Sequence, residues 1–167
     1  MPPLEESEIS FDANVATDFD LTGNVLLLQQ LFPERILISD FVQAELGKAN
    51  ITLTVARVIE LTTEDHLNLF EQLHSRNPRL GLGEIGAIAV AHIRRAVLAS
   101  NDSQARSAAT EIGLAITGSL GILEHAVTSG SIEAARAVSI AENMILAGAW
   151  FSEELIDLFR ARVLAKN

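Results

Sequence analysis

The fold class is decided by residues 96–117, Ala-Val-Leu-Ala-Ser-Asn-Asp-Ser-Gln-Ala-Arg-Ser-Ala-Ala-Thr-Glu-Ile-Gly-Leu-Ala-Ile-Thr. They begin with an apolar run over 96–100 and end with a second one over 114–117, and each run predicts a strand. Between the two runs, residues 102–112 predict a helix that Gly113 closes. Two strands joined by one helix through short loops form a βαβ unit, whose strands run parallel in one sheet. The stretch therefore predicts an α/β domain.

The same alternation extends over the rest of the chain. Residues 9–12 predict a strand that runs into a loop, and residues 35–39 predict a second strand that is apolar almost throughout. Such strands are typical of a parallel sheet buried on both faces. The remaining predicted elements are a strand near a sheet edge within 52–61 and helices over 24–32, 41–48 (capped by Asp40), 62–76, 83–95, 118–129, 132–147 and 152–165. We expect a mainly parallel central sheet flanked by helices, with a helical C-terminal third.

Length and composition suit one cytoplasmic domain. The chain has 167 residues, of which 49% are hydrophobic, and it has no cysteine, which excludes disulfides, cysteine-ligated zinc and a catalytic thiol. Residues 1–8 are polar and lack the features of a secretory signal, and no apolar run reaches the roughly 18 residues that span a bilayer. We expect a polar tail over 1–8, a single domain over 9–167, a cytoplasmic location and no membrane association.

The net charge of −10 limits how the protein can meet nucleic acid. A net-negative chain is not drawn to nucleic acid by its overall field. Two interpretations remain: the protein does not bind nucleic acid, or it binds through a local basic strip while a metal ion offsets an acidic pocket.

Polar side chains gather where the predicted strands end. In open parallel sheets, ligands bind beyond the carboxyl ends of the strands. Five connections place oxygen-bearing side chains there, namely Asp12 and Asn14, Glu45, Glu84, Asn101 and Asp102, and Thr117 and Ser119. Each acid alone is most often a helix cap or a surface residue. Only their joint placement indicates a functional site.

Converging carboxylates without basic partners repel each other and are stabilised by a cation. Hard oxygen ligands favour Mg²⁺ or Mn²⁺, and Mg²⁺ is usually held by one or two carboxylates together with water and substrate phosphate. Such a site can generate hydroxide and brace a phosphate during in-line attack. The pattern therefore predicts phosphodiester hydrolysis.

Three segments in the first half of the chain resemble motifs of PIN-domain proteins. Phe11-Asp-Ala-Asn-Val15 resembles the opening motif, an aspartate at the end of the first strand followed by a small polar residue. Ile38-Ser-Asp-Phe-Val-Gln-Ala-Glu-Leu46 resembles the second motif, with a glutamate on the following helix. Gly83-Glu-Ile-Gly-Ala-Ile-Ala-Val-Ala91 is similar to the Gly-Glu…Ala-Ile-Ala helix start of one PIN-like branch.

Three further segments resemble the same branch in the same order. Asn101-Asp-Ser-Gln-Ala-Arg106 resembles its Asp-Asp…Ala-Arg motif, and Thr117-Gly-Ser-Leu-Gly-Ile-Leu123 resembles its Gly-Thr-Leu-Gly segment. Ala147-Gly-Ala-Trp-Phe-Ser152 resembles the Gly-aromatic-Ser start of its last helix. The similarity covers nearly the whole chain after the tail.

The resemblance implies a three-layer PIN-like fold and a Mg²⁺- or Mn²⁺-dependent ribonuclease, as in the toxins of bacterial toxin–antitoxin pairs. Its substrate would be RNA, and its protein partner would be antitoxin-like. The residues carried over are the catalytic metal-site acids Asp12, Glu45 and Glu84, the further acid Asp102, and the supporting polar residues Asn14 and Ser119.

One position departs from the pattern. Asn101 stands where the first acid of the Asp-Asp pair is expected, and its carbonyl oxygen can bind a metal without bringing a charge. The departure motivates a second hypothesis of a different class: a diverged, catalytically weak PIN-like module that binds RNA or a protein partner.

A third hypothesis rests on Gly81-Leu-Gly-Glu-Ile-Gly86, which matches the Gly-x-Gly-x-x-Gly fingerprint of dinucleotide-binding enzymes. That fingerprint requires a strand directly before it, and His74-Ser-Arg-Asn-Pro-Arg-Leu80 does not predict one. The glycines more simply indicate the start of a helix.

Arginines supply the candidate phosphate contacts. Arg94 and Arg95, with Arg106, form the predicted nucleic-acid-binding group, although a solvated helix end is the simpler explanation. Trp150 and Phe151 precede the last helix and are expected to pack rather than to stack on bases.

A stripe of small and branched residues on one predicted helix has two interpretations. Ala134, Val138, Ala141 and Ile145 lie along one face of the helix over 132–147. Such a stripe suits the domain core or the interface of a homodimer.

Overall fold

The centre of the protein is a five-stranded, all-parallel sheet with the strand order β3-β2-β1-β4-β5. The computed structural model describes residues 4 and 6–165. The strands are short: β1 is Ile9–Phe11, β2 is Ile36–Ser39, β3 is Arg57–Ile59, β4 is Val97–Ala99 and β5 is Ile116–Thr117. The side chains of β1, β2 and β4 are buried throughout, as expected for a sheet covered on both faces.

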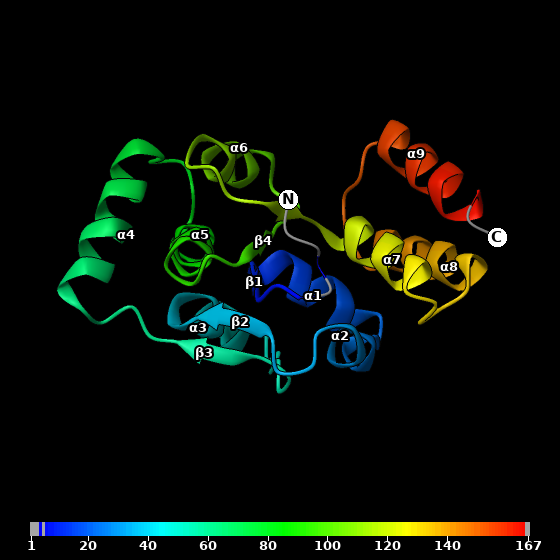
Figure 1. Cartoon of the computed structure of the whole chain (residues 1–167), viewed down its shortest axis with the longest axis horizontal. Coiled ribbons are helices and arrows are strands. Elements are labelled where there is room, and N and C mark those ends of the chain that lie inside the picture. The colour runs from blue at the N-terminus through cyan, green and yellow to red at the C-terminus, as the bar shows by residue number, and fades with distance from the viewer. Residues whose placement is uncertain (1–3, 5, 166–167) are drawn as a thin grey trace.

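Helices cover both faces of the sheet and extend beyond its β5 end. They are α1 Ala13–Leu21, α2 Val25–Leu31, α3 Asp40–Lys48, α4 Glu64–Arg76, α5 Leu82–Arg94, α6 Ser103–Glu111, α7 Ser119–Thr128, α8 Ala134–Leu146 and α9 Glu153–Leu164. Helix α5 packs on β1, β2 and β4, with α4 outside it, while α1 and α2 lie on the other side of the strands (Figure 1). Helices α7, α8 and α9 pack on one another as the predicted helical C-terminal third (Figure 1). The predicted three-layer α/β fold is confirmed.

The βαβ unit within residues 96–117 forms as predicted. Strand β4, helix α6 and strand β5 follow one another, and the two strands pair in parallel with Leu98 opposite Ile116. The predicted edge strand within 52–61 is β3, at the end of the sheet next to β2.

The largest error of the sequence prediction lies directly after Asp12. The segment was expected to be a loop but forms helix α1. Its buried residues, Ala13, Ala16 and Phe19 with Val15, recur at helical spacing. Because two of them are alanines, the apolar signal was weak. The error matters, because α1 carries a carboxylate into the site described below.

The predicted cap of α3 was also wrong by one residue. Ser39 precedes the helix, and its Oγ accepts a hydrogen bond from the backbone N–H of Val42 at 3.1 Å. Asp40 is instead the first residue of α3, and its Oδ1 accepts from the N–H of Leu61 at 3.4 Å. Serine and aspartate are comparable caps, so propensity alone does not separate them.

Part of the predicted tail is tied to the domain. Residues 1–3 and 5 lie outside the described residues, but the guanidinium of Arg35 donates to the carbonyl oxygens of Leu4 and Ser7 at 3.0 and 3.1 Å. Glu8 forms ion pairs with Arg94 and Arg57. Within the described part of the chain, no helix is long and apolar enough to cross a membrane.

Candidate functional site

Asp12 is the buried centre of the site. It follows β1 directly and occupies the N-cap position of α1 without a side-chain cap hydrogen bond. Its backbone N–H donates to the carbonyl oxygen of Ala99 on β4 at 2.9 Å. Its side chain is only 1% exposed, and Oδ2 accepts a hydrogen bond from Ser100 Oγ at 2.9 Å. The strand ends of β1 and β4 therefore fix this carboxylate from two sides.

The protonation of Asp12 is strongly perturbed. Burial raises the pKa of Asp12 from its ordinary 3.8 to about 7, because a carboxylate loses its hydration in the protein. The hydrogen bond from Ser100 opposes this rise, whereas the nearby charges of Glu84 and Glu45 reinforce it. A cation beside Asp12 would favour its ionised form and lower this pKa.

Glu84 reaches the same place from the first turn of α5. Its Oε2 accepts from the backbone N–H of Gly81 at 2.7 Å, which anchors the side chain at the helix start. Burial raises the pKa of Glu84, the Gly81 hydrogen bond lowers it, and the charges of Asp102 and Glu45 raise it. Helix α5 is buried from Ile85 to Ala91, so the position of Glu84 is set by the core.

Glu45 lies against the start of α5. A Cβ atom added to Gly83 would lie 2.1 Å from Glu45 Oε2, so only a glycine leaves room for this carboxylate. Asp102, at the end of β4, caps α6: its Oδ1 accepts from the N–H of Ala105 at 2.8 Å. The expectation that acids at these positions act as helix caps is thus correct for Asp102 and Glu84. Both residues nevertheless lie close enough for the charge of Asp102 to raise the pKa of Glu84.

The four acids Asp12, Glu45, Glu84 and Asp102 form one electrostatic group, called the acid cluster below. The charged neighbours that raise the pKa values of Asp12 and Glu84 are all members of it. In the described part of the chain, no three acidic, histidine or cysteine side chains are close enough to form a ready-made metal cage. The donors instead suit a hydrated Mg²⁺ or Mn²⁺ ion, which needs only one or two carboxylates and keeps several waters.

A second carboxylate network adjoins the acid cluster and was missed from the sequence. Asp18, on α1, accepts through Oδ2 from Asn101 Nδ2 at 2.8 Å and from Ser119 Oγ at 2.6 Å. Asn101 Oδ1 in turn accepts from the backbone N–H of Ser119 at 3.0 Å, and Asn101 Nδ2 also contacts Ser119 Oγ at 2.9 Å. Burial raises the pKa of Asp18, while its two hydrogen bonds lower it. Both ends of the Asn101 amide are therefore used within the protein.

The family of the chain follows from its match to a known family model. A model of the family described as a PIN domain matches residues 8–164. The chain belongs to the PIN-domain family. Neither the curated proteins nor the solved structures gave a significant match. The PIN-domain family is of the nuclease type and in general depends on divalent metal ions.

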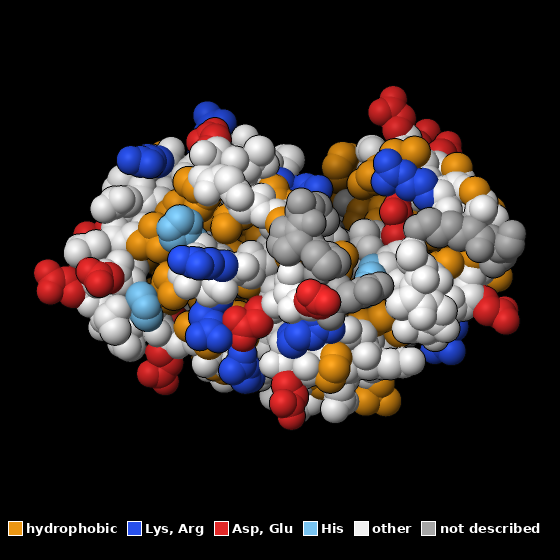
Figure 2. All heavy atoms as spheres, viewed as in Figure 1, with side chains coloured by type: hydrophobic (Ala, Val, Ile, Leu, Met, Phe, Trp, Pro, Cys, Tyr) orange, Lys and Arg blue, Asp and Glu red, His pale blue; other side chains and the backbone are white. Residues whose placement is uncertain are grey.

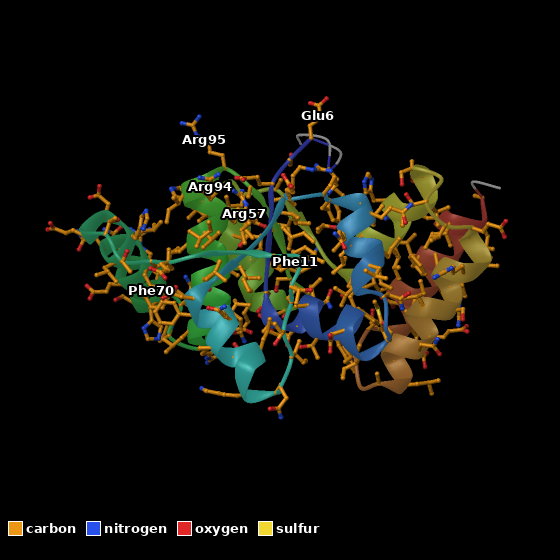
Figure 3. All side chains as sticks on the ribbon, turned by 90° about the horizontal axis from the view of Figure 1, so that it is seen from below. Glu6, Phe11, Arg57, Phe70, Arg94 and Arg95 are labelled. Carbon is orange, nitrogen blue, oxygen red and sulfur yellow. The ribbon has the colours of Figure 1, made fainter. Side chains whose placement is uncertain are left out.

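The structure divides the arginines that were predicted to bind nucleic acid. Arg94 and Arg95 lie at the far end of α5 from Glu84, where Arg94 donates to Glu8 at 2.9 and 3.0 Å. Figure 3 shows them together with Arg57 at one edge of the PIN domain. They are therefore not at the acid cluster. Their predicted contact with nucleic acid would therefore lie at the opposite end of α5 from Glu84.

Arg106 is close to the site, but part of it is used structurally. Its Nη1 donates to the carbonyl oxygens of Ser100 at 2.9 Å and of Thr117 at 2.8 Å, which links the ends of β4 and β5. Burial lowers the pKa of Arg106 from its ordinary value. Asn14, one of the predicted supporting residues, is exposed on α1 and lines a pocket with Asp18 and Asp102.

The dinucleotide fingerprint has no structural counterpart in this PIN domain. Residues 81–86 begin helix α5, but the element before them is helix α4, which ends at Arg76. A dinucleotide site needs a strand there, and the carboxylate of Glu84 already holds the Gly81 N–H that would face a phosphate. The glycines serve close packing instead.

The Asp18–Asn101 contact leads to a prediction about charge. In an Asn101→Asp variant, a carboxylate oxygen would replace Nδ2 at 2.8 Å from Asp18 Oδ2. We expect the metal-free variant to lose about 1–3 kcal/mol of unfolding free energy, because two carboxylates then face each other without a donor. Urea denaturation in EDTA measures the loss.

A matched double variant controls for mere disruption of the site. Asp18→Asn combined with Asn101→Asp exchanges the two groups and restores one amide and one carboxylate. Recovery of most of the lost stability is expected. If the double variant is no more stable than Asn101→Asp alone, the hydrogen bond between these residues does not carry the stability assigned to it.

Proposed function

We propose that this PIN domain is a divalent-metal-dependent endoribonuclease that hydrolyses RNA phosphodiester bonds at the acid cluster. The observation that carries the proposal is Asp12: a carboxylate 1% exposed at a strand end whose pKa is raised by burial and whose charged neighbours are themselves carboxylates. A protein keeps such a group at a stability cost when a cation uses it.

The roles of the residues follow from their surroundings. Asp12 and Glu84 would hold the ion, with Glu45 and Asp102 on its outer side through direct or water contacts. Bound there, Mg²⁺ or Mn²⁺ supplies a Lewis acid that lowers the pKa of water and neutralises the phosphate. Ser100 fixes Asp12 in one orientation, and the Gly81 N–H does the same for Glu84. Asp102 would orient the attacking water.

The direct test is incubation of the pure protein with single-stranded RNA and Mn²⁺. Cleavage that disappears in EDTA and in a Glu84→Gln variant supports the proposal. An Asp20→Asn variant is a suitable control, since Asp20 lies on α1 outside the acid cluster. Cleavage that persists in Glu84→Gln would remove that residue from the mechanism.

Metal binding should stabilise the fold in a pH-dependent way. Because the ligand carboxylates must lose their protons, Mn²⁺ competes with the proton on Asp12, whose pKa is raised to about 7. We expect the rise in melting temperature caused by millimolar Mn²⁺ to be larger at pH 8 than at pH 5.5. Differential scanning fluorimetry measures it, and an equal rise at both pH values would contradict the proposal.

A second candidate function is favoured by Asn101. Its Nδ2 donates to Asp18 and its Oδ1 accepts from the Ser119 N–H, and the amide brings no charge to the acid cluster. A PIN domain that binds Mn²⁺ and RNA, or a protein, without turnover is the corresponding alternative. Calorimetry separates the two: Mn²⁺ binding without cleavage supports the binding module, and cleavage rejects it.

A toxin role remains a proposal about biological context. The net charge of −10 suits a basic, antitoxin-like protein partner, and the setting would be the cytoplasm. On the α8 stripe that was expected to face the core or a homodimer interface, Ala134 and Ala141 are buried and Ile145 is 40% exposed. Most of the stripe therefore packs in the domain core. Homodimerisation stays a prediction, and co-purification with the product of an adjacent gene tests the antitoxin partner.

A further inference from the structure

Trp150 is a large aromatic side chain left in solvent. It is 83% exposed in the segment between α8 and α9, whereas the neighbouring Phe151 is partly buried against the core. The sequence prediction that both residues pack is therefore right for Phe151 and wrong for Trp150. A single exposed apolar side chain is ordinary in itself. What distinguishes Trp150 is its position at two pockets.

Trp150 stands between two adjoining pockets. The first, called the acid pocket, has a volume of about 370 Å³ and is lined by Asn14, Asp18 and Asp102 among others. The second, called the groove, has a volume of about 570 Å³ and is bounded by α6, β5, α7 and α9. Trp150 and Asn101 line both of them, so a linear ligand can pass from one to the other without leaving the surface.

The two pockets differ in charge. The charged residues that line the acid pocket are Asp18 and Asp102, whereas the groove is lined by Arg106 and Arg162 with only Glu124 as an acid. Glu124 lies 3.5 Å from Arg162, so one cationic charge remains over the groove. An anionic ligand is thus accepted by the groove directly and by the acid pocket only together with a cation.

The walls of the groove are apolar. Leu155 and Leu158 of α9 line it, and each is 45% exposed. Figure 2 shows this side of the surface hollowed between α6 and α9, with hydrophobic and basic side chains on its walls. A flat apolar group attached to a phosphate combines the two features, and the volume is within the range of about 300–1,000 Å³ common for small-ligand pockets.

We propose that the groove is a nucleotide subsite for single-stranded RNA, in which a base stacks on the indole of Trp150 and the adjoining phosphate meets Arg106 or Arg162. The inference rests on the proposed function, since the groove adjoins the acid pocket, which Asp102 of the acid cluster lines. Base stacking on exposed aromatics together with arginine contacts is how proteins hold single strands without reading sequence. A chain with net charge −10 needs such a local site to bind RNA at all.

An apolar helix of a protein partner is the competing occupant. It would fit Leu155 and Leu158, but it would use neither the opening into the acid pocket nor Arg106 at the groove floor. Continuity with the acid pocket, which Asp102 lines, therefore favours RNA. The experiment below treats the protein partner as one of its outcomes.

The intrinsic fluorescence of Trp150 can report on ligand binding to the groove. Trp150 is the single tryptophan, and the sequence has no tyrosine, so emission from the aromatic side chains reports on the subsite. The titrant is a short single-stranded RNA in Ca²⁺, which replaces Mn²⁺ to avoid paramagnetic quenching. We expect saturable quenching of the emission, parallel to the rise in anisotropy of labelled RNA. RNA binding that leaves the emission unchanged, or no RNA binding, overturns the subsite.

Three variants separate stacking from a general structural effect. Trp150→Ala should weaken RNA binding about five- to hundredfold, the range found for a single stacked base. Trp150→Phe should recover most of the affinity, and Leu146→Ala, another highly exposed apolar residue that lines neither pocket, should leave it unchanged. Equal affinity of Trp150→Ala and the parent chain overturns the proposal, as does a protein partner that shifts the Trp150 emission when RNA does not.

The outcomes also distinguish this inference from the proposed function. Quenching by RNA without any cleavage in Mn²⁺ retains the subsite and rejects the nuclease. Cleavage with unchanged affinity in Trp150→Ala retains the nuclease and rejects the subsite.

Discussion

Replacing Asp12 by asparagine is expected to abolish metal-dependent RNA cleavage and, at the same time, to stabilise the metal-free protein above pH 7. Asparagine keeps the shape of the side chain and still accepts the hydrogen bond from Ser100. Helix α1 loses no side-chain cap, because Asp12 makes no cap hydrogen bond. What it removes is the buried negative charge. Loss of a ligand charge should lower the rate of cleavage at least about hundredfold, since even indirect metal partners are worth 10–100-fold.

The sign of the stability effect follows from the pKa. Folded Asp12 holds its proton up to pH about 7, whereas the unfolded chain releases it near the ordinary 3.8. Between these values the folded state binds more protons, so the free energy of unfolding falls as the pH rises. Because asparagine does not titrate, the free energy of unfolding of the variant does not fall with pH for this reason. Above pH 7 the gain should be on the order of 2–4 kcal/mol, because one pKa unit corresponds to about 1.4 kcal/mol.

Urea denaturation in EDTA at pH 5 and pH 8 measures the effect, with Asp20→Asn as the control on the same helix. The stability gain of Asp12→Asn should be clearly larger at pH 8 than at pH 5. Saturating Mn²⁺ should reduce it, because the ion then stabilises the parent and not the variant. A gain independent of pH would show that Asp12 does not carry a raised pKa. Cleavage retained by the variant would show that Asp12 is not a ligand of the catalytic metal.

Replacing Gly83 by alanine should impair the site while sparing the fold. The new Cβ would lie 2.1 Å from Glu45 Oε2, so this exposed and flexible carboxylate must swing away from α5. The helix itself gains from alanine by up to about 1 kcal/mol. We expect an unchanged or higher melting temperature in EDTA together with a loss of Mn²⁺ affinity and of cleavage of about tenfold.

Two other glycines serve as matched comparisons. At Gly86, an added Cβ would meet Ser39 Oγ at 2.4 Å and Ser39 Cβ at 3.1 Å, and Ser39 caps α3 within the core. Gly86→Ala should therefore destabilise the fold, by about 1–3 kcal/mol. At Gly47 nothing lies within 4 Å, and Gly47→Ala should be harmless to activity. If Gly83→Ala and Gly47→Ala bind Mn²⁺ equally well, Glu45 has no part in the metal site.

The sequence was most informative where the chain repeats a simple pattern. The apolar runs of β1, β2 and β4 and the alanine-rich helix α5 have few alternative structures, and each was predicted at nearly its observed position. The acids that follow those strands were identified for the same reason, because parallel strands bring their carboxyl ends to one edge of the sheet. The PIN-domain family was recognised from motifs that sit on these elements.

The remaining features depend on distances between elements that are far apart in sequence. Asp18 was missed because its role requires that residues 13–21 form a helix facing Asn101 and Ser119. Arg94 lies ten positions after Glu84 on α5, so its distance from the acid cluster follows from the length of that helix. The exposure of Trp150 depends on the path of the segment between α8 and α9, which no local pattern of residues predicts.

The central claim is that the acid cluster is a divalent-cation site, and crystals soaked in Mn²⁺ test it most directly. Anomalous scattering locates Mn²⁺ independently of any assumption about chemistry. We expect one strong anomalous peak between the carboxylates of Asp12 and Glu84, lost in crystals of Asp12→Asn. Mn²⁺ bound elsewhere, with these two carboxylates free of metal at saturating concentration, would contradict the claim.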